Sequence, residues 1–309
     1  MNIKKRILPV LVFTVVLLAV MTVGVSADSS IDLNKKGSFS AGLNISGVEV
    51  RLYNVGSISE DGSIKCKPEY EKYSVSLDEA GTADGLGAAQ ALEAYFIRDG
   101  VAPLAKQKSG RDGMVHFTDL VPGAYLVSCD SVAGEGESAV FPPMIMRLPS
   151  WIDEGWKYDL GAEMKHHSRE GQEYCTVYKA WEMRGNGGEH PEEVIVQLLC
   201  DGRVYDEQIL NAGNSWRYAW NDLDADHVWT VIEKSVPEGY NVELRNDGNV
   251  FIVRNVSEES DEPVVPEGPE KDENLPQTGQ LWWPVLMMLV CGMLLITAGV
   301  YLRRTDYED

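Results

Sequence analysis

The chain of 309 residues has little positive charge: 27 lysine and arginine residues stand against 48 aspartate and glutamate residues, and the formal net charge is −21 at pH 7. No segment is basic enough to bind nucleic acid or an anionic lipid surface, so both are excluded as partners. The sequence also has no Ser/His/Asp grouping, no paired carboxylates and no metal-ligand spacing. We therefore expect a protein that is not an enzyme and that uses no metal or other cofactor.

Long apolar runs are absent except near the two ends. Lys5 and Arg6 precede the apolar residues 7–25, and Ala27 completes a small-residue cleavage site. This arrangement predicts a secretory signal peptide over residues 1–27, with a retained membrane anchor as the alternative.

The second apolar run, residues 281–302, is long enough to cross a bilayer as a helix, which takes about 20 residues. Arg303 and Arg304 follow this run and would hold its end on the cytoplasmic side. Taken alone, the run predicts an ordinary transmembrane anchor.

The pentapeptide LPQTG stands just before this run, with Leu275, Pro276, Thr278 and Gly279 at its defining positions. Together with the apolar run and the arginines, it resembles the cell-wall sorting signal of Gram-positive surface proteins. The resemblance implies that a sortase cleaves between Thr278 and Gly279 and joins the threonine carbonyl to an amine of peptidoglycan or of another subunit. Residues 275–309 would then form a sorting signal whose transmembrane helix is discarded, and the mature protein would be secreted and covalently anchored to the cell wall.

Between the two ends, apolar runs are short and turn residues recur, as in all-β sandwiches. We divide this region into a first domain, residues 28–167, a second domain, residues 168–256, and a spacer, residues 257–274. The spacer is acidic, contains prolines and cannot bury a core. One helical pattern, residues 85–98, has the spacing of a short packing helix. The fold class predicted for the chain is therefore all-β, with two tandem sandwiches.

Cysteine is also scarce. Apart from Cys291 in the second apolar run, the cysteines are Cys66, Cys129, Cys175 and Cys200, two in each predicted domain. An even number in an exported chain suggests one disulfide within each domain. Four thiols without a disulfide are the alternative, because spacing alone does not supply the geometry that a disulfide needs.

The end of the first domain contains a possible attachment site for another subunit. The string DGMVHFTDLVPGAYLV, residues 112–127, is similar to a repeat of collagen-adhesin B-type and pilin domains. WKYDLGAEMK, residues 156–165, resembles the pilin motif of sortase-assembled pili, although the motif's tyrosine and proline are replaced by Glu163 and Met164. In that family the motif lysine, here Lys165, accepts the threonine of the next subunit. Strand alternation turns Lys165 outward, and a merely solvated lysine is the alternative.

The second domain resembles the Cna B-type domain from YCTVYKAWE, which begins at residue 174, to VFIVRNV, which ends at residue 256. That fold is a β-sandwich of the Ig-like, prealbumin-like kind. WTVIEKSVPEGY, residues 229–240, also resembles the pilin E-box. The resemblance implies a bond between a lysine and an asparagine side chain, formed with the help of a glutamate.

Strand periodicity independently places three polar side chains of this domain on buried faces. On their strands, Lys179 shares a face with Val177, Glu233 with Val231, and Asn255 with Val253. Burying these three groups separately would cost several kcal/mol, so we expect them to meet.

Apolar surroundings favour the neutral amine of a lysine and the protonated form of a carboxyl. The Lys179 amine could then attack the Asn255 carbonyl while Glu233 shuttles protons, so that ammonia leaves and an isopeptide bond remains. The family resemblance implies these same roles. The alternative is a buried Lys179–Glu233 ion pair beside an uninvolved asparagine. In the first domain Cys129 stands where the glutamate would be, and no such bond is expected there.

These features predict a sortase-anchored surface protein, and specifically a pilus subunit of the shaft, basal or ancillary kind. Its partners would be a sortase, peptidoglycan and other pilin subunits. A stand-alone adhesin that binds a host surface ligand is the alternative. An SDS-resistant ladder in cell-wall extracts would distinguish the two.

Overall fold

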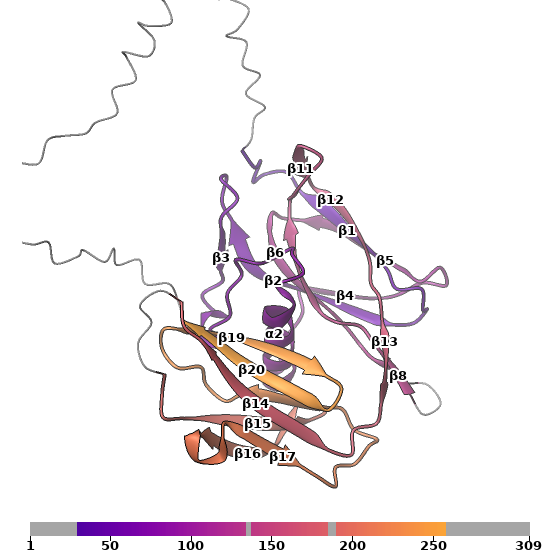
Figure 1. Ribbon diagram of the computed structural model, residues 1–309. Coiled ribbons are helices and arrows are strands. Elements are labelled where there is room, and N and C mark those ends of the chain that lie inside the picture. The colour runs from indigo at the N-terminus through magenta and orange to yellow at the C-terminus, as the bar shows by residue number, and fades with distance from the viewer. Residues whose placement is uncertain (1–29, 134–136, 185–189, 258–309) are drawn as a thin grey trace, which may run out of the picture. The chain divides into compact units, whose positions relative to one another are not determined.

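The computed structural model of the chain describes residues 30–133, 137–184 and 190–257 (Figure 1). The predicted signal peptide, the acidic spacer after Ser257, the LPQTG motif and the transmembrane helix lie outside the described residues. Within these ranges most of the regular secondary structure is β-strand, which confirms the all-β prediction. No helix in them is long and apolar enough to span a membrane.

The first half of the described chain contains the elements β1 (Gly37–Gly42), β2 (Glu49–Ile58), β3 (Ile64–Cys66), the 3-10 turn η2 (Glu71–Tyr73), α2 (Leu86–Asp99), β4 (Ala105–Lys108), β5 (Met114–Leu120), β6 (Gly123–Cys129), β7 (Val132–Ala133), β8 (Glu137–Val140), β9 (Met144–Leu148), β10 (Ser150–Ile152), β11 (Gly155–Lys157), β12 (Asp159–Glu163) and β13 (His167–Glu170). The second half contains β14 (Cys175–Glu182), β15 (Glu193–Cys200), β16 (Arg203–Asn211), the 3-10 turn η3 (Ala212–Asn214), β17 (Arg217–Trp220), β18 (Trp229–Glu233), β19 (Tyr240–Asp247) and β20 (Val250–Ser257).

The first sandwich packs a sheet of order β12-β1-β5 against a sheet of order β3-β2-β6-β9, with β4 alongside β2. Alternate residues of the facing strands, among them Phe39, Leu52, Phe117 and Tyr125, fill the space between the two sheets. The first strand of the sandwich, β1, runs parallel to its last strand, β12.

The central strand β6 is buried on both faces along its whole length. Tyr125 and Val127 point into the sandwich, whereas Leu126 points to the other side and packs with residues of α2. The helix has the apolar face expected from its sequence, and Gly100 ends it with a left-handed backbone (φ 64°) that glycine adopts without strain. The sheet is therefore covered by a second sheet on one side and by α2 on the other.

The second sandwich packs a sheet of order β17-β14-β20-β19 against a sheet of order β16-β15-β18. Its first strand, β14, again runs parallel to its last strand, β20. The core between the sheets is apolar, with Val177, Leu198, Val231 and Phe251 fully or almost fully buried.

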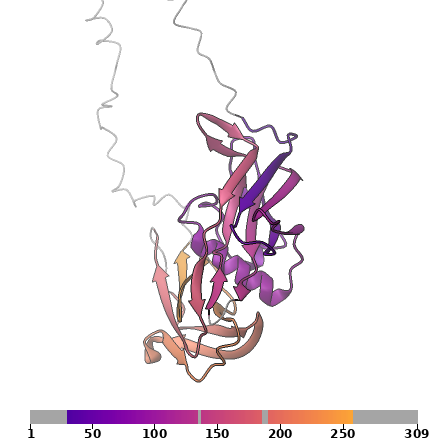
Figure 2. The same cartoon turned by 90° about the vertical axis from the view of Figure 1, so that its right-hand side faces the viewer.

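Helix α2 also belongs to the core of the second sandwich. Its buried residues Leu92, Tyr95 and Phe96 form one continuous apolar cluster with residues of β2 and β6 and with Val242 and Leu244 of β19. Figures 1 and 2 both show α2 between the strands of the first sandwich and those of the second. A helix whose sequence lies within the first domain thus packs against both sandwiches.

The strand expected over residues 156–165 is divided into two short strands, β11 and β12. They are separated at Tyr158, whose ring is buried and whose hydroxyl accepts a hydrogen bond from the Asp32 backbone at 2.8 Å. Leu160 and Ala162 nevertheless pack on the core as alternation predicted. Strand β19 has the alternating pattern of Tyr240, Val242 and Leu244, which sequence reading passed over.

No disulfide joins the four cysteines of the described residues, which corrects the expectation of one disulfide per domain. Cys66 lies opposite Gly56 on β2, whereas Cys129 lies opposite Val50 on the same strand. That separation along β2 is about 20 Å, against a limit of about 7 Å between the Cα atoms of a disulfide. Cys175 and Cys200 lie on facing sheets of the second sandwich.

Candidate functional site

Lys179 lies in the middle of β14 with its side chain turned into the second sandwich. Alternation along the strand buries Cys175, Val177 and Lys179 and exposes Tyr178. The Lys179 side chain is fully buried. Its Nζ donates to the backbone oxygens of Ala180 at 3.1 Å and Val253 at 3.4 Å.

Glu233 ends β18 and Asn255 lies on β20, and both residues are completely buried. Each follows two inward apolar residues at every second position of its strand, as the sequence predicted. Three strands from two facing sheets therefore contribute Lys179, Glu233 and Asn255 to one apolar core.

The three side chains contact one another through Glu233. Lys179 Nζ lies 3.6 Å from Glu233 Oε2, and Asn255 Nδ2 donates a hydrogen bond to Glu233 Oε1 at 3.3 Å. Asn255 Oδ1 is buried and has no hydrogen-bond partner among the described residues. Glu233 thus contacts the amide nitrogen of Asn255 and not its carbonyl oxygen. A half-turn of the amide would exchange the two atoms.

Burial shifts both ionisable groups of the site toward their uncharged forms. Burial lowers the pKa of the Lys179 ammonium and raises the pKa of the Glu233 carboxyl, and the attraction between the two charges opposes both shifts. Proton transfer from the ammonium to the carboxylate would give a neutral amine beside a protonated carboxyl. This pair is the one that nucleophilic attack on an amide requires.

An aromatic cluster surrounds the lysine. Lys179 Nζ lies 4.1 Å from the centre of the Trp181 ring. The Trp181 ring stacks on His190 at 4.8 Å and contacts the rings of Trp216 and Tyr240 edge-on. The face of the Trp181 ring lies against the amine and attracts its charged form, so it opposes part of the effect of burial.

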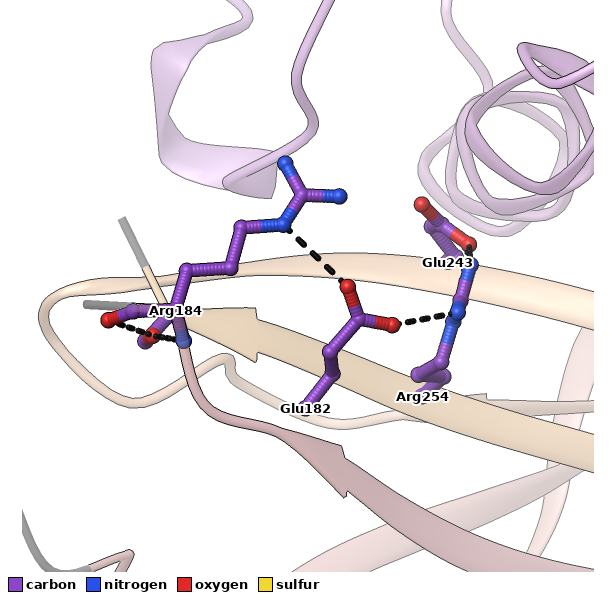
Figure 3. Close-up of polar contacts among 5 residues, drawn as sticks. Glu182, Arg184, Glu243 and Arg254 are labelled. Carbon is purple, nitrogen blue, oxygen red and sulfur yellow. Dashed lines mark hydrogen bonds and ion pairs between the residues drawn. The ribbon is translucent and has the colours of Figure 1, made fainter. Parts of the chain in front are cut away.

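On the opposite face of the same sheet, side chains next to the site form an ion-pair network (Figure 3). Arg254, beside Asn255 on β20, pairs with Glu243 of β19 and, at 2.6 Å, with Glu182 of β14. Arg184 extends the network with a 3.2 Å contact to Glu182. The network joins the three strands β14, β20 and β19. Its charged side chains pair with one another on the outer face and do not contact Lys179 or Asn255 in these ion pairs.

The remaining predicted site residues are dispersed. Lys165 is exposed just beyond β12, outward as expected. Leu275, Pro276, Thr278 and Gly279 lie outside the described residues. In the first sandwich the Cys129 thiol lies 3.7 Å from the Met164 sulfur, and burial raises the pKa of this thiol to about 12, so it stays protonated.

Cys200, Asp201 and His227 form the one group among the described residues whose side chains could together hold a metal ion, since their ligand atoms lie within 4.8 Å of one another. Asp201 Oδ2 already contacts His227 Nδ1 at 2.6 Å, and Asp201 Oδ1 accepts from the Val228 backbone at 2.9 Å. Both carboxylate oxygens of Asp201 therefore already have hydrogen-bond partners in the loop before β18. A larger cleft of about 800 Å³, lined among others by Arg51, Phe141 and Asn246, does not include the three core residues.

Comparison with known proteins places the three core residues in one family match. Residues 175–256 match the family model described as "Cna protein B-type domain". A collagen adhesin of Staphylococcus aureus is 31% identical over 116 residues, which cover 34% of this chain and 10% of that protein. The matched part is thus about a tenth of the length of that relative.

Solved structures give weaker likenesses. A single B repeat unit of the collagen-binding surface protein Cna of Staphylococcus aureus has a TM-score of 0.25 and 17% identity, over 72% of this chain and 98% of the other. The full-length major pilin SpaD from Corynebacterium diphtheriae has a TM-score of 0.30 and 13% identity, over 74% of this chain and 66% of the other. The family match therefore rests on sequence: the segment that contains Lys179, Glu233 and Asn255 matches the Cna protein B-type domain family from β14 into β20.

Proposed function

We propose that the second sandwich closes itself with an isopeptide bond between Lys179 and Asn255, and that the chain is a wall-anchored surface protein of the pilus-subunit kind. The observation that carries the first part is that a buried amine, a buried carboxyl and a buried amide from three strands meet. The carboxyl of Glu233 lies 3.6 Å from the Lys179 amine and 3.3 Å from the Asn255 amide nitrogen. A buried ion pair alone would need no amide beside it.

The reaction proceeds through the neutral amine. Lys179 Nζ attacks the Asn255 side-chain carbonyl carbon, a C–N bond forms, and the lysine nitrogen gives up a proton. Glu233 lies next to the leaving Nδ2 atom and supplies the proton with which it departs as ammonia. The carboxyl regains a proton from the attacking nitrogen, so Glu233 ends the reaction unchanged.

The anchoring part of the proposal is supported by the LPQTG motif and by the family match. The bond would join the first and last strands of the second sandwich, which lie side by side in parallel. Force applied along the chain at the ends of the domain would then load a covalent bond, which suits a protein linked at its C-terminus to a wall. Lys165, exposed on the other sandwich, offers the amine through which a second subunit could be joined.

Intact-mass spectrometry of the purified chain tests the crosslink. We expect a mass lower than the sequence mass by one ammonia, and a digest containing Lys179 and Asn255 in one branched peptide. Glu233→Gln should restore the full mass, because an amide of the same shape cannot shuttle the proton. Glu193→Gln, an exposed glutamate on β15, is the matched control and should keep the lower mass.

A wild-type chain at full sequence mass, with linear peptides only, would show that the three residues form a buried polar cluster and nothing more. Loss of ammonia that persists in Glu233→Gln would instead remove Glu233 from the mechanism.

A further inference from the structure

Two edge strands lie at the site. β18 carries Glu233, and β19 carries Val242, the residue that pairs with Asn255 of β20. β18 is the last strand of its sheet and β19 is the last strand of the facing sheet. Edge strands leave one row of backbone donors and acceptors without a strand partner. In this protein, groups of the first domain occupy part of that row on both strands.

On β18 the partner is Tyr95 of α2. Lys234 donates its backbone N–H to Ile195 of β15, so the carbonyl of the preceding residue, Glu233, faces away from the sheet. The Tyr95 hydroxyl donates to this carbonyl at 2.9 Å, in a buried position. The Tyr95 ring is held between the Tyr73 ring, stacked at 5.1 Å, and the Arg98 guanidinium at 5.0 Å.

On β19 the partner is Ser74, which ends the 3-10 turn η2. The Val242 backbone N–H donates to the Ser74 carbonyl at 2.7 Å. Val242 is the direct cross-strand neighbour of Asn255. The first domain thus contacts the backbone of Glu233 itself and the backbone of the residue beside Asn255.

The helix also reaches β15 and β19 through side chains. Arg98 donates to Gln197 of β15 at 3.0 Å. Gly87, in the first turn of α2, lies close against Glu243 of β19. A side chain at this position would be crowded, because its Cβ atom would lie 3.0 Å from the Glu243 Cβ atom. The docking of α2 is therefore close at both of its ends, and the helix contacts the edge strands of both sheets, at Glu233 through Tyr95.

We infer that the first domain completes the crosslinking site of the second, with Tyr95 as a positioning residue that fixes the backbone of Glu233. This inference rests on the proposed isopeptide bond. Tyr95 does not touch the reacting atoms; it holds the strand whose side chain must lie between Lys179 and Asn255. Crosslinking would then follow docking of the two domains, and an undocked chain would react slowly.

The test compares Tyr95→Phe with Tyr73→Phe in the full chain. Both changes remove a hydroxyl from adjacent rings, but the Tyr73 hydroxyl donates to Asp99 at 2.8 Å and not to the second domain. The chain is made by cell-free synthesis, stopped at intervals in denaturant and digested, and the ratio of branched to linear Lys179 peptide gives the rate. We expect crosslinking to slow about tenfold in Tyr95→Phe, and to change less than twofold in Tyr73→Phe.

Two further measurements separate positioning from general stability. Both substitutions are repeated in a Glu233→Gln chain, which cannot crosslink, and their melting temperatures are compared; similar melting with different crosslinking rates supports positioning. The rate is also measured across pH, and a positioning role lowers it at every pH without changing the shape of the profile.

Equal rates for Tyr95→Phe and wild type would overturn the inference, as would a changed pH profile, which would make the hydroxyl part of the proton transfer. A wild-type chain that forms no branched peptide would instead overturn the proposed bond itself, so the two failures are distinct.

Discussion

At the scale of single residues, Lys179, Glu233 and Asn255 are costly to keep as separate side chains. A lysine and a glutamate removed from water each lose solvation worth several kcal/mol, and Asn255 Oδ1 has no hydrogen-bond partner among the described residues. An amide between Lys179 and Asn255 would replace the ammonium with a neutral N–H and release the surplus amide nitrogen as ammonia. The placement of the three groups therefore favours the reaction energetically.

The rate of crosslinking should depend on pH with a maximum. Burial lowers the pKa of Lys179 and raises the pKa of Glu233, so the neutral amine and the protonated carboxyl coexist near neutrality. In acid the rate should fall because the amine is protonated; in alkali it should fall because the carboxyl loses its proton. Quenched digests of freshly synthesised chain in buffers from acid to alkaline give the profile. A rate that keeps rising into alkali would show that the carboxyl proton is not needed.

Loss of the crosslink should lower stability strongly. Lys179→Met keeps an unbranched side chain of similar length but removes the nucleophile. Because the bond closes a loop of about 76 residues, its absence should lower the free energy of unfolding by roughly 4 to 5 kcal/mol, by analogy with a disulfide. Urea unfolding followed by tryptophan fluorescence measures the difference.

The control is Lys234→Met, which removes a partly exposed lysine paired with Glu207 at 2.8 Å. That surface pair should contribute no more than about 1 kcal/mol. Equal losses in the two variants would mean that Lys179 contributes as an ordinary ion pair.

The inward direction of the three core residues could be predicted from sequence because strand alternation has a period of two and their companions are apolar. Their contact distances and the orientation of the Asn255 amide could not, since these depend on how two sheets face each other. The cysteine expectation was wrong for the same reason: an even count says nothing of the distance between Cys66 and Cys129, which the register of β2 sets.

At the scale of elements, both sandwiches pair their first and last strands in parallel, but only one pair has reactive groups. On β1 and β12 the inward residues are apolar, among them Phe39, Ala41 and Leu160. On β14 and β20 the equivalent inward row includes Lys179 and Asn255. The same topology therefore permits a crosslink in the second sandwich and an ordinary apolar core in the first, where Cys129 contacts Met164.

The end of β12 is where a link to another subunit can be tested. Lys165→Arg keeps the positive charge but lacks an amine that a sortase can acylate, so it should abolish high-molecular-weight ladders on denaturing gels of wall extracts. Lys157→Arg, at the exposed end of β11, is the matched control and should leave the ladders unchanged. A ladder that persists in Lys165→Arg would assign the link to another lysine, and the absence of any ladder in wild type would favour a stand-alone adhesin.

At the scale of the whole molecule, the sequence predicted two sandwiches and a helix but not the place of the helix. The apolar face of α2, with Leu92, Tyr95 and Phe96, predicts that the helix packs on another element, but it does not identify that element. Phe96 packs on Tyr53 of β2 within the first domain, whereas the Tyr95 hydroxyl donates to Glu233 of β18. Such long-range docking depends on three-dimensional contacts between segments more than a hundred residues apart, and no local pattern encodes it.

Under the proposed function, the LPQTG segment keeps the chain at the cell surface. Thr278→Ala should prevent the transfer of the chain to peptidoglycan, because the resemblance to sorting signals makes the threonine carbonyl the acyl group that is transferred. We expect the variant in the membrane fraction or the medium of the producing cells, and not in the fraction that wall-degrading enzymes release. Fractionation followed by immunoblotting measures the distribution.

Gln277→Ala is the control for this experiment, since the middle position of the motif is the variable one in the family that LPQTG resembles. It changes the neighbouring residue, the same apolar run follows it, and we expect it to be found with the wall as in wild type. Because both changes lie outside the two sandwiches, neither should alter the loss of ammonia from the second domain, and intact mass verifies that each chain has folded. Wall linkage that survives Thr278→Ala would refute the sorting assignment while leaving the proposed isopeptide bond untouched.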